Sequence, residues 1–246
     1  MFDSYAEIFE ERARSYHSAM EAYPHARDAE FRSVLEPLDD LPAGTLCDMP
    51  AGGGYLARRL RPDLAYVGVD PASDFVACGS RMAKIIRAEP SDVPLESGSV
   101  DYVVSLAGLH HEPNLGPVFR EMRRLIRDGG RAVIADVAHD TPPARFLNGF
   151  VARSNPMGHD GRFLNDDTAA LLEAAGFRIV ADELVSTPWT FADAAEAGRF
   201  AGQLFGTENA TAAEVTDALA SEIGFTSEPS RLQFDWSLRR IVCAAG

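Results

Sequence analysis

A glycine-rich turn behind a short apolar run constrains the fold of this chain more than any other feature. The run reads TLCD at residues 45–48, and the turn and the start of the next element read MPAGGGYL at residues 49–56. Gly52 and Gly54 lack side chains that would keep a ligand away from the backbone. A helix that opens at about Tyr55 would present unpaired amide groups with a partial positive charge, which stabilise an anionic group. The sequence therefore predicts a strand, a turn and a helix that together hold a cofactor.

Two classes of cofactor use such a turn. The spacing Gly52-x-Gly54-x-x-Ala57 fits the relaxed dinucleotide fingerprint, and Asp70 stands where that fingerprint places its ribose-binding acid. An NAD(P)-dependent oxidoreductase is therefore one alternative. Asp48 favours the other class, because its negative charge before the turn would repel a pyrophosphate and attract a cofactor with a cationic amino acid end.

The segment DMPAGGG at residues 48–54 resembles the class I S-adenosylmethionine-dependent methyltransferases, whose usual pattern is Asp-x-Gly-x-Gly-x-Gly. Pro50 replaces the first glycine, which stiffens the turn but leaves Gly52 and Gly54 in place. Residues 89–101 are similar to the family's acidic loop and fourth strand. The segment RLIRDGGR at residues 124–131 is similar to its Leu-Lys-Pro-Gly-Gly signature. These ordered matches cover residues from about 44 to 138.

The resemblance implies a single α/β domain over residues 1–246 with a Rossmann-like, doubly wound sheet. The sheet is expected to have seven mostly parallel strands, with the last one, at about 232–244, antiparallel beside the fifth. Apolar periodicity places helices over about 3–38, which the small-molecule branch of the family uses to close over cofactor and acceptor. The expected parts are an N-terminal helical flap at 1–43, a cofactor-binding core at 44–138, a lid or acceptor loop at 139–165, and a C-terminal half at 166–246 whose helical insertion at 189–225 forms a lid.

Local signals define several of these elements. Residues 115–127 have the pattern of a helix that ends at the glycines of Asp128-Gly129-Gly130, before a fifth strand at 131–137. Residues 139–162 are polar and rich in Pro and Gly, and their length predicts a lid or binding loop. Thr211 and Glu214 form a capping box that opens the second helix of the insertion.

The resemblance also implies which residues hold the cofactor, S-adenosylmethionine. Asp70 would accept hydrogen bonds from two ribose hydroxyls, or it could only cap the helix near Ser73. Phe75 is expected either on the adenine or in the core. Glu89 takes the place of the acid that accepts from the adenine amino group, with Asp92 as the substitute. The expected cofactor residues are Asp48, Pro50, Ala51, Gly52, Gly54, Asp70, Pro71, Phe75, Glu89, Pro90, Ser105, Leu106 and Ala107.

The acceptor side is expected around Tyr5, Tyr16, His110 and Arg145. His110 or His111 is a candidate catalytic base, since imidazole titrates near neutral pH, or both histidines only shape the pocket. We expect no metal site, because two histidines adjacent in sequence rarely face one ion without further ligands. Other basic side chains of the loop could meet an anionic acceptor together with Arg145, or lie on the surface without a ligand: these are Arg153, His159 and Arg162.

Composition limits the partners. A formal charge of −14 and a pI near 4.8 argue against nucleic acid or an anionic membrane as the partner, because both need a basic face. Three widely spaced cysteines without a CxxC pair indicate neither a disulfide framework nor a zinc site, and favour a reducing cytoplasm. No apolar run of membrane length is present. We expect a cytoplasmic monomer or homodimer.

The function predicted from these features is methyl transfer from S-adenosylmethionine to a small-molecule acceptor, with oxygen as the favoured atom. A sulfonium already makes its methyl group electrophilic, so alignment of donor and acceptor and exclusion of water suffice. The NAD(P)-dependent oxidoreductase and a non-methylating cofactor-binding protein of the same fold remain alternatives.

Overall fold

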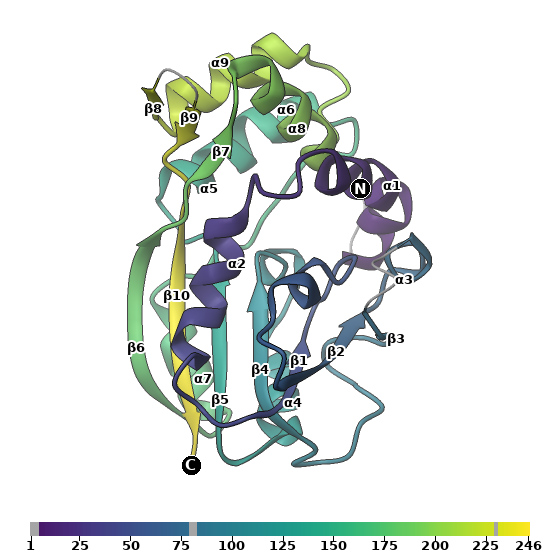
Figure 1. The fold of residues 1–246 in the computed structure, drawn as a ribbon, viewed down its shortest axis with the longest axis vertical. Coiled ribbons are helices and arrows are strands. Elements are labelled where there is room, and N and C mark those ends of the chain that lie inside the picture. Colours follow the sequence, from purple (N-terminus) through teal and green to yellow (C-terminus); the bar gives the residue numbers. More distant parts are fainter. Residues whose placement is uncertain (1–4, 79–82, 229–230) are drawn as a thin grey trace.

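The computed structural model describes residues 5–78, 83–228 and 231–246. Its centre is a seven-stranded sheet with the order β3-β2-β1-β4-β5-β10-β6 (Figure 1). The expected doubly wound sheet is therefore confirmed. The first four residues of the expected flap lie outside the described residues. The strands are β1 (Gly44–Asp48), β2 (Leu64–Asp70), β3 (Ile85–Arg87), β4 (Val100–Leu106), β5 (Ile126–Asp136), β6 (Phe177–Ser186) and β10 (Ser237–Ala245).

The strands of the sheet run parallel except at one side. β1 pairs in parallel with β2 and β4, and β4 pairs in parallel with β5. β10 lies antiparallel between β5 and β6, with Ile241 opposite Ile134 and Asp182. The last strand is thus antiparallel beside the fifth, as the resemblance implies. Since the carboxyl ends of the parallel strands meet at one edge, the residues after β1, β2, β4 and β5 gather there.

Helices cover both faces of the sheet, so its strands are apolar on both sides. α2 (Asp28–Leu35) packs on one face, where Phe31 and Val34 join a core cluster with Val104. α4 (Leu115–Leu125) covers the other face with Phe119 and Met122, next to α7 (Asp167–Ala174) (Figure 1). α1 (Tyr5–Ala22) lies across the carboxyl edge and contacts α3 (Ser73–Cys78) and α8 (Ala194–Phe205).

A second layer stands above the carboxyl edge of the sheet (Figure 1). It contains α8 and α9 (Ala212–Glu222), whose capping box between Thr211 and Glu214 is formed. It also contains a small antiparallel sheet that the sequence analysis missed, with the order β7-β9-β8. Its strands are β7 (Trp189–Phe191), β8 (Phe225–Glu228) and β9 (Arg231–Phe234).

The single long strand expected at 232–244 is wrong, because the chain changes sheets at Asp235 and Trp236. The Trp236 amide bonds back to the Phe234 carbonyl, and its own carbonyl accepts from the Thr187 amide. β9 therefore belongs to the small sheet and β10 to the large one. The buried Trp236 ring occupies the corner between them.

The glycine stop expected after residue 127 is also wrong. α4 ends at Leu125, and β5 begins at once with Ile126, which is buried and pairs with Val100. Gly129 has a φ of +79° and lies in an irregular part of the ladder. Tertiary pairing with β4 thus ends the helix before the residues that usually stop one.

The expected loop at 139–165 is helical over most of its first half. It forms α5 (Pro142–Phe146), one π-helical turn η4 (Leu147–Val151) and α6 (Ala152–Ser154). Phe146, Leu147 and Val151 are buried in the core between the two layers, which holds these short turns in place. Only the stretch after α6 remains irregular. No helix among the described residues is long and apolar enough to cross a membrane.

Candidate cofactor and acceptor site

A buried carboxylate stands at the end of β1, where the glycine turn begins. Asp48 ends the strand and accepts a hydrogen bond from the Tyr66 hydroxyl at 2.8 Å. Burial raises the pKa of Asp48 to about 7, with the bond from Tyr66 acting against this shift. Gly52 and Gly54 adopt left-handed φ angles of +54° and +70°, which glycine accepts without strain.

The turn is open where a ligand would approach. A Cβ atom at Gly52 would meet nothing within 4 Å, so this stretch of backbone faces free space. Pro50 packs instead against Gly108, where a Cβ atom would lie 2.4 Å from the proline ring. The expected helix after the turn is wrong: the segment is a short 3-10 helix, η2 (Tyr55–Arg59), and it gives no regular helix N-terminus for an anion.

Asp70 ends β2 and links three parts of the site. Its carboxylate accepts from the Gly52 amide at 2.7 Å, the Ala72 amide at 2.9 Å and the Tyr5 hydroxyl at 3.0 Å. It therefore also supports the start of α3, in line with one of its two expected roles. Burial raises the pKa of Asp70 to about 7, and the hydrogen bonds from Ala72, Gly52 and Tyr5 act in the opposite direction.

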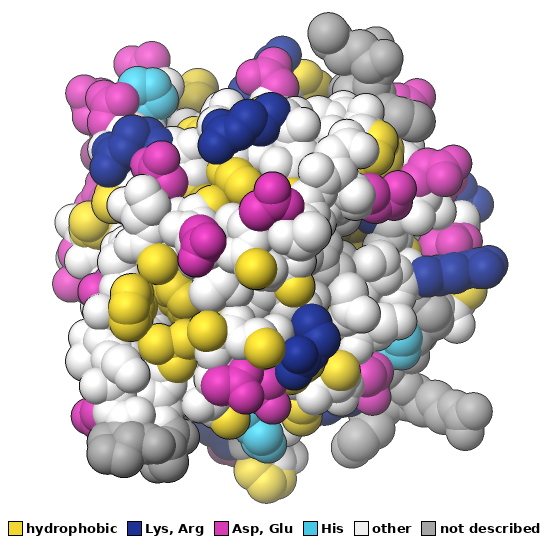
Figure 2. Space-filling view, turned by 90° about the horizontal axis from the view of Figure 1, so that it is seen from above, with side chains coloured by type: hydrophobic (Ala, Val, Ile, Leu, Met, Phe, Trp, Pro, Cys, Tyr) yellow, Lys and Arg dark blue, Asp and Glu magenta, His cyan; other side chains and the backbone are white. Residues whose placement is uncertain are grey.

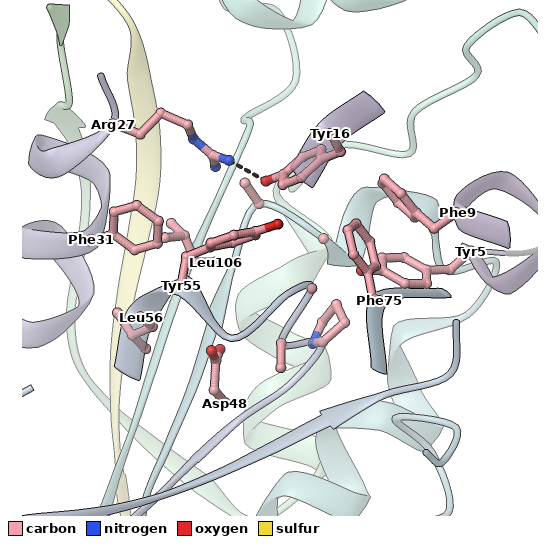
Figure 3. A pocket seen from close by; sticks show the side chains of 15 residues that line it. Tyr5, Phe9, Tyr16, Arg27, Phe31, Asp48, Tyr55, Leu56, Phe75 and Leu106 are labelled. Carbon is pink, nitrogen blue, oxygen red and sulfur yellow. Dashed lines mark hydrogen bonds between the residues drawn. The ribbon is translucent and has the colours of Figure 1, made fainter. Parts of the chain in front are cut away.

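A first cavity opens beside this turn (Figure 3). Its volume is about 50 Å³, whereas ligand pockets usually measure about 300–1,000 Å³. Aromatic side chains of α1 fill much of the space, and Phe9 lies 4.9 Å from Phe75 between ring centroids. Phe75 thus belongs both to the core and to the cavity wall. The wall comprises Tyr5, Phe9, Tyr16, Arg27, Phe31, Asp48, Pro50, Ala51, Gly52, Tyr55, Leu56, Phe75, Leu106, Ala107 and Gly108.

Other expected cofactor residues lie around this cavity without lining it. Ser105 is buried in β4, and its hydroxyl has no partner among the described residues. Pro71 and Pro90 are buried, whereas Glu89 is exposed at the end of β3. The charge of Glu89 contributes to the raised pKa of Asp70, so the two carboxylates face the same region.

Tyr5 is placed differently from the expectation. The sequence predicts it in the acceptor wall, but its hydroxyl bonds Asp70, the expected ribose acceptor. Its ring packs on Phe9 at 4.6 Å and is buried. Burial raises the pKa of Tyr5 well above its ordinary value, so the hydroxyl stays protonated and donates. The Tyr5 hydroxyl therefore occupies one of the acceptor positions of Asp70.

A second cavity adjoins the first and shares Phe9, Tyr16, Arg27 and Ala107 with it. Its far side is aromatic, with Trp189 stacked on Trp236 at 4.4 Å. Such walls fit a small, largely apolar molecule. The further lining residues are Arg12, Glu30, His110, His111, Val137, Leu147, His159, Trp189, Leu204, Phe205 and Trp236.

A buried polar network that the sequence analysis missed forms one wall of this second cavity. Arg27 donates from Nε to Glu30 at 2.9 Å and from a terminal nitrogen to the Tyr16 hydroxyl, and the Trp189 indole donates to the other Glu30 oxygen. Burial opposes the charge of Arg27, yet the nearby Glu30 carboxylate leaves the pKa of Arg27 raised. The i, i+3 spacing of Arg27 and Glu30 is the only sign of the network in the sequence.

The histidines lie on the side of the cavity nearer β5. His110 and His111 form the 3-10 turn η3 (Leu109–His111), and Nδ1 of His110 lies 2.7 Å from Oδ1 of Asp136 at the end of β5. His159 joins them from the stretch after α6, which the sequence analysis did not foresee. Arg145 is exposed, donates to the Asp140 carbonyl and lines neither cavity, so the fold does not bring it together with Tyr16 and His110.

Residues 47–134 match the family described as "Methyltransferase domain". This match covers the glycine turn beside the first cavity and both strand-end acids, Asp48 and Asp70. Residues 47–134 thus form a domain of the class I S-adenosylmethionine-dependent methyltransferase family. S-adenosylmethionine is the cofactor of this family, as expected from the sequence.

Solved structures share the fold of this methyltransferase at low identity. A possible histamine N-methyltransferase from Thermotoga maritima is 16% identical, with a TM-score of 0.64 over 98% of this chain and 100% of that one. The [4+2]-cyclase SpnF is 17% identical, with a TM-score of 0.65 over 98% of this chain and 95% of that one.

Curated relatives are similar over shorter stretches. A tRNA (carboxymethyluridine(34)-5-O)-methyltransferase from Mus musculus is 30% identical over 125 residues, which are 48% of this chain and 18% of that protein. The chain spans 60% or less of the length of the first curated relatives it matches.

Proposed function

We propose that this protein transfers a methyl group from S-adenosylmethionine to a small-molecule acceptor, with oxygen as the receiving atom. The observation that carries the proposal is the pair of adjoining cavities that share Phe9, Tyr16, Arg27 and Ala107. Donor and acceptor in such cavities meet at the end of β4. The enzyme would bind the donor at the glycine turn and the acceptor between the aromatic walls.

The residues at the turn fit a cationic cofactor. Asp48 and Asp70 are buried, and neither forms an ion pair within the described part of the chain. A buried carboxylate without a cation is costly, so a positively charged ligand would be bound more tightly by the ionised pair. We assign Asp48, Gly52 and Gly54 to the methionine end of the cofactor. Asp70 would bind the ribose and Glu89 the adenine, and Leu106 with Ala107 would lie against the lower face of the cofactor.

The protein's own contribution is alignment and proton removal. S-adenosylmethionine supplies an electrophilic methyl group when bound. Apolar rings around the junction of the cavities exclude water and hold the acceptor for in-line attack. Asp136 accepts from Nδ1 of His110, so the Nε2 lone pair of His110 is free to take the proton of an acceptor hydroxyl.

Charge and enclosure favour a small acceptor over RNA, despite the tRNA-methylating relative. The formal charge is −14, and the face above the carboxyl edge carries acidic side chains among its basic ones (Figure 2). Nucleic-acid binding relies on basic surfaces that neutralise phosphates. The acceptor cavity is bounded by buried side chains such as Trp189 and Trp236 rather than by an open groove.

Calorimetric titration tests the cofactor assignment. We expect S-adenosylmethionine and S-adenosylhomocysteine to bind and NADH not to bind. Asp70→Asn should weaken binding at least about 100-fold, because hydrogen bonds to a charged group are worth about 1.5–3 kcal/mol each. Asp74→Asn is the matched control, because Asp74 forms a partly exposed ion pair with Arg14 and has no assigned contact with the cofactor. Binding of NADH without binding of S-adenosylmethionine would instead favour the alternative of an NAD(P)-dependent oxidoreductase.

Turnover tests the reaction. Release of S-adenosylhomocysteine with a panel of small aromatic alcohols, amines and carbon acids identifies the receiving atom. Cofactor binding without release for any member would favour the non-methylating alternative.

A further inference from the structure

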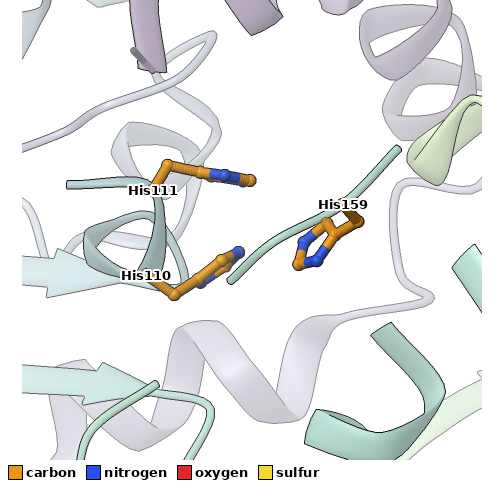
Figure 4. A group of neighbouring side chains, drawn as sticks. All are labelled: His110, His111 and His159. Carbon is orange, nitrogen blue, oxygen red and sulfur yellow. The ribbon is translucent and has the colours of Figure 1, made fainter. Parts of the chain in front are cut away.

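Three imidazoles from two separate segments surround one space beside the acceptor cavity (Figure 4). His110 and His111 come from η3 after β4, and His159 comes from the stretch after α6. One ring nitrogen of each lies within 4.8 Å of those of the other two. Three of the six histidines of this chain are thus grouped around one space.

Hydrogen bonds fix the tautomers of two of these rings. The Asn148 side chain donates from Nδ2 to the Gly161 carbonyl at 3.0 Å and accepts at Oδ1 from the Gly161 amide at 2.8 Å. These bonds identify Oδ1 as the atom 2.8 Å from Nδ1 of His159, so Nδ1 donates and Nε2 keeps its lone pair. Oδ1 of Asp136 lies 2.7 Å from Nδ1 of His110, so this Nδ1 also donates and Nε2 of His110 keeps its lone pair.

A carboxylate or amide behind an imidazole is the usual support of a histidine that binds a metal. It orients the ring and raises the basicity of the opposite nitrogen.

We propose that His110, His111 and His159 bind one divalent first-row transition ion, of which Zn²⁺ is the representative. Imidazole nitrogens suit zinc, cobalt, nickel, copper and iron, whereas magnesium and calcium prefer oxygen. Ligands about 2.0–2.1 Å from zinc are roughly 3.4 Å apart in a tetrahedral site, so the rings must close by about an ångström from their present spacing. Three protein ligands leave a fourth position open, as in catalytic sites.

The role of the ion deepens the proposed methyl transfer and rests on it. The open position faces the acceptor cavity that the three histidines line. An acceptor hydroxyl bound there would pass its proton to the water molecule that it displaces from the ion as the metal–oxygen bond forms, because the ion lowers the pKa of the hydroxyl. The resulting oxyanion attacks the methyl group, a carbon–oxygen bond forms as the carbon–sulfur bond breaks, and S-adenosylhomocysteine leaves. His110 is then a ligand rather than the base.

This inference departs from the expectation of no metal site. That expectation rested on two adjacent histidines without a further ligand. His159 supplies the third ligand through the fold of the segment after α6, and Asp136 and Asn148 support the rings from two other elements.

Metal binding is tested directly, without cofactor or turnover. Chelator-treated protein is dialysed against Zn²⁺ for metal analysis, and against Co²⁺ for its visible absorption spectrum. We expect one ion per chain and the intense bands of a tetrahedral cobalt site. His159→Ala should lower the affinity at least about 100-fold, and Asn148→Ala about 10–100-fold, as loss of a supporting partner does. His139→Ala is the control, because His139 is exposed.

The outcomes separate this inference from the proposed function. Equal zinc content in His159→Ala and the parent protein, or a cobalt spectrum without tetrahedral bands, would overturn the metal site. Calorimetry with S-adenosylmethionine on the same samples confirms that His159→Ala is folded, since the glycine turn lies in the other cavity. If zinc binds but the cofactor does not, the metal site stands and the proposed methyl transfer fails.

Discussion

The two cavities that meet at Ala107 are built from different material. The first has the backbone of the glycine turn and the strand-end acid Asp48 on one side, within residues 48–108, and side chains of α1 and the start of α2 on the other. The second is made of side chains from α1, α2, the stretch after α6, β7, α8 and the corner at Trp236. A cofactor site of the first kind depends on local geometry, whereas the second depends on how distant segments pack.

This difference predicts where each cavity is vulnerable. The acceptor cavity depends on buried side-chain partners, and loss of one should lower the stability of the fold. The cofactor cavity depends on open backbone and on uncompensated charge, so changes there should alter binding and pH dependence more than stability.

The largest expected effect is on the acceptor side. Glu30→Gln leaves the buried Arg27 guanidinium without its counter-charge. Breaking a buried pair by removing one partner costs about 3–5 kcal/mol, which urea denaturation would measure as a fall in the free energy of unfolding. Glu36→Gln is the control, because Glu36 is exposed and Arg240 keeps its second partner Glu183, so the loss should be at most about 1 kcal/mol. Similar losses in both variants would contradict a special role for the buried network.

The cofactor side should respond to pH instead. Burial raises the pKa of Asp48 from 3.8 to about 7, so the folded protein binds a proton that the unfolded chain releases. The contribution of Asp48 to stability is then present at about pH 4 and is lost as the pH rises to about 7. One pKa unit corresponds to about 1.4 kcal/mol, so the loss is of order 4 kcal/mol at most.

The variant Asp48→Asn isolates this contribution. Its free energy of unfolding, minus that of the parent protein, should increase between pH 4 and pH 8, while the same difference for the exposed Asp63→Asn stays constant. Histidines that titrate in this range cancel in the difference. A flat difference for Asp48→Asn would mean that its carboxylate is already compensated in the cofactor-free protein.

A third change separates binding from stability. Gly52 and Gly129 both have left-handed φ angles, and a Cβ atom at either would meet nothing within 4 Å. Alanine at either position should therefore cost about 1–2 kcal/mol of stability from backbone strain alone. Only Gly52→Ala should also weaken S-adenosylmethionine binding, by about tenfold or more, because its methyl group enters the cofactor's space. Equal affinities in calorimetry would move the cofactor away from this turn.

The same contrast explains how far the sequence could predict the molecule. The glycine turn and the acids that end β1 and β2 could be located from local patterns. The antiparallel last strand was expected from the resemblance to the family. The end of α4 at Leu125 could not be predicted in this way, because pairing of Ile126 with Val100 decides it. The break at Trp236 likewise depends on a bond to Thr187 from a distant segment.

The acceptor cavity lies almost entirely beyond such patterns. His159 stands 48 positions after His111 in a stretch with polar and glycine-rich composition, and only packing of residues 142–154 brings the two rings together. The sequence offered one signal for this cavity: Asp136 is an acid at the carboxyl end of a strand, the edge at which such sheets bind ligands. Arg145 differs from His159: the composition of its segment suggested a place at the site, and the fold leaves its side chain exposed.

The smallest expected effect tests the contact between α1 and the cofactor cavity. Tyr5 donates to Asp70 at 3.0 Å, where ribose hydroxyls are assigned, so the cofactor and Tyr5 compete for one carboxylate. Tyr5→Phe removes the competing hydroxyl but keeps the ring packed on Phe9, in the cluster that also contains Phe75. A hydrogen bond contributes about 0.5–1.5 kcal/mol net, so calorimetry should show affinity for S-adenosylmethionine rising by up to about tenfold.

The matched control is Tyr23→Phe, whose hydroxyl accepts from Arg199 away from both carboxylates and whose affinity should not change. Weaker binding by Tyr5→Phe would instead place the hydroxyl among the cofactor's own partners. In that case α1 would form a wall of the cofactor cavity in the bound state. The cofactor cavity would then also depend on side chains of the N-terminal helix, and the contrast between the two cavities would be smaller.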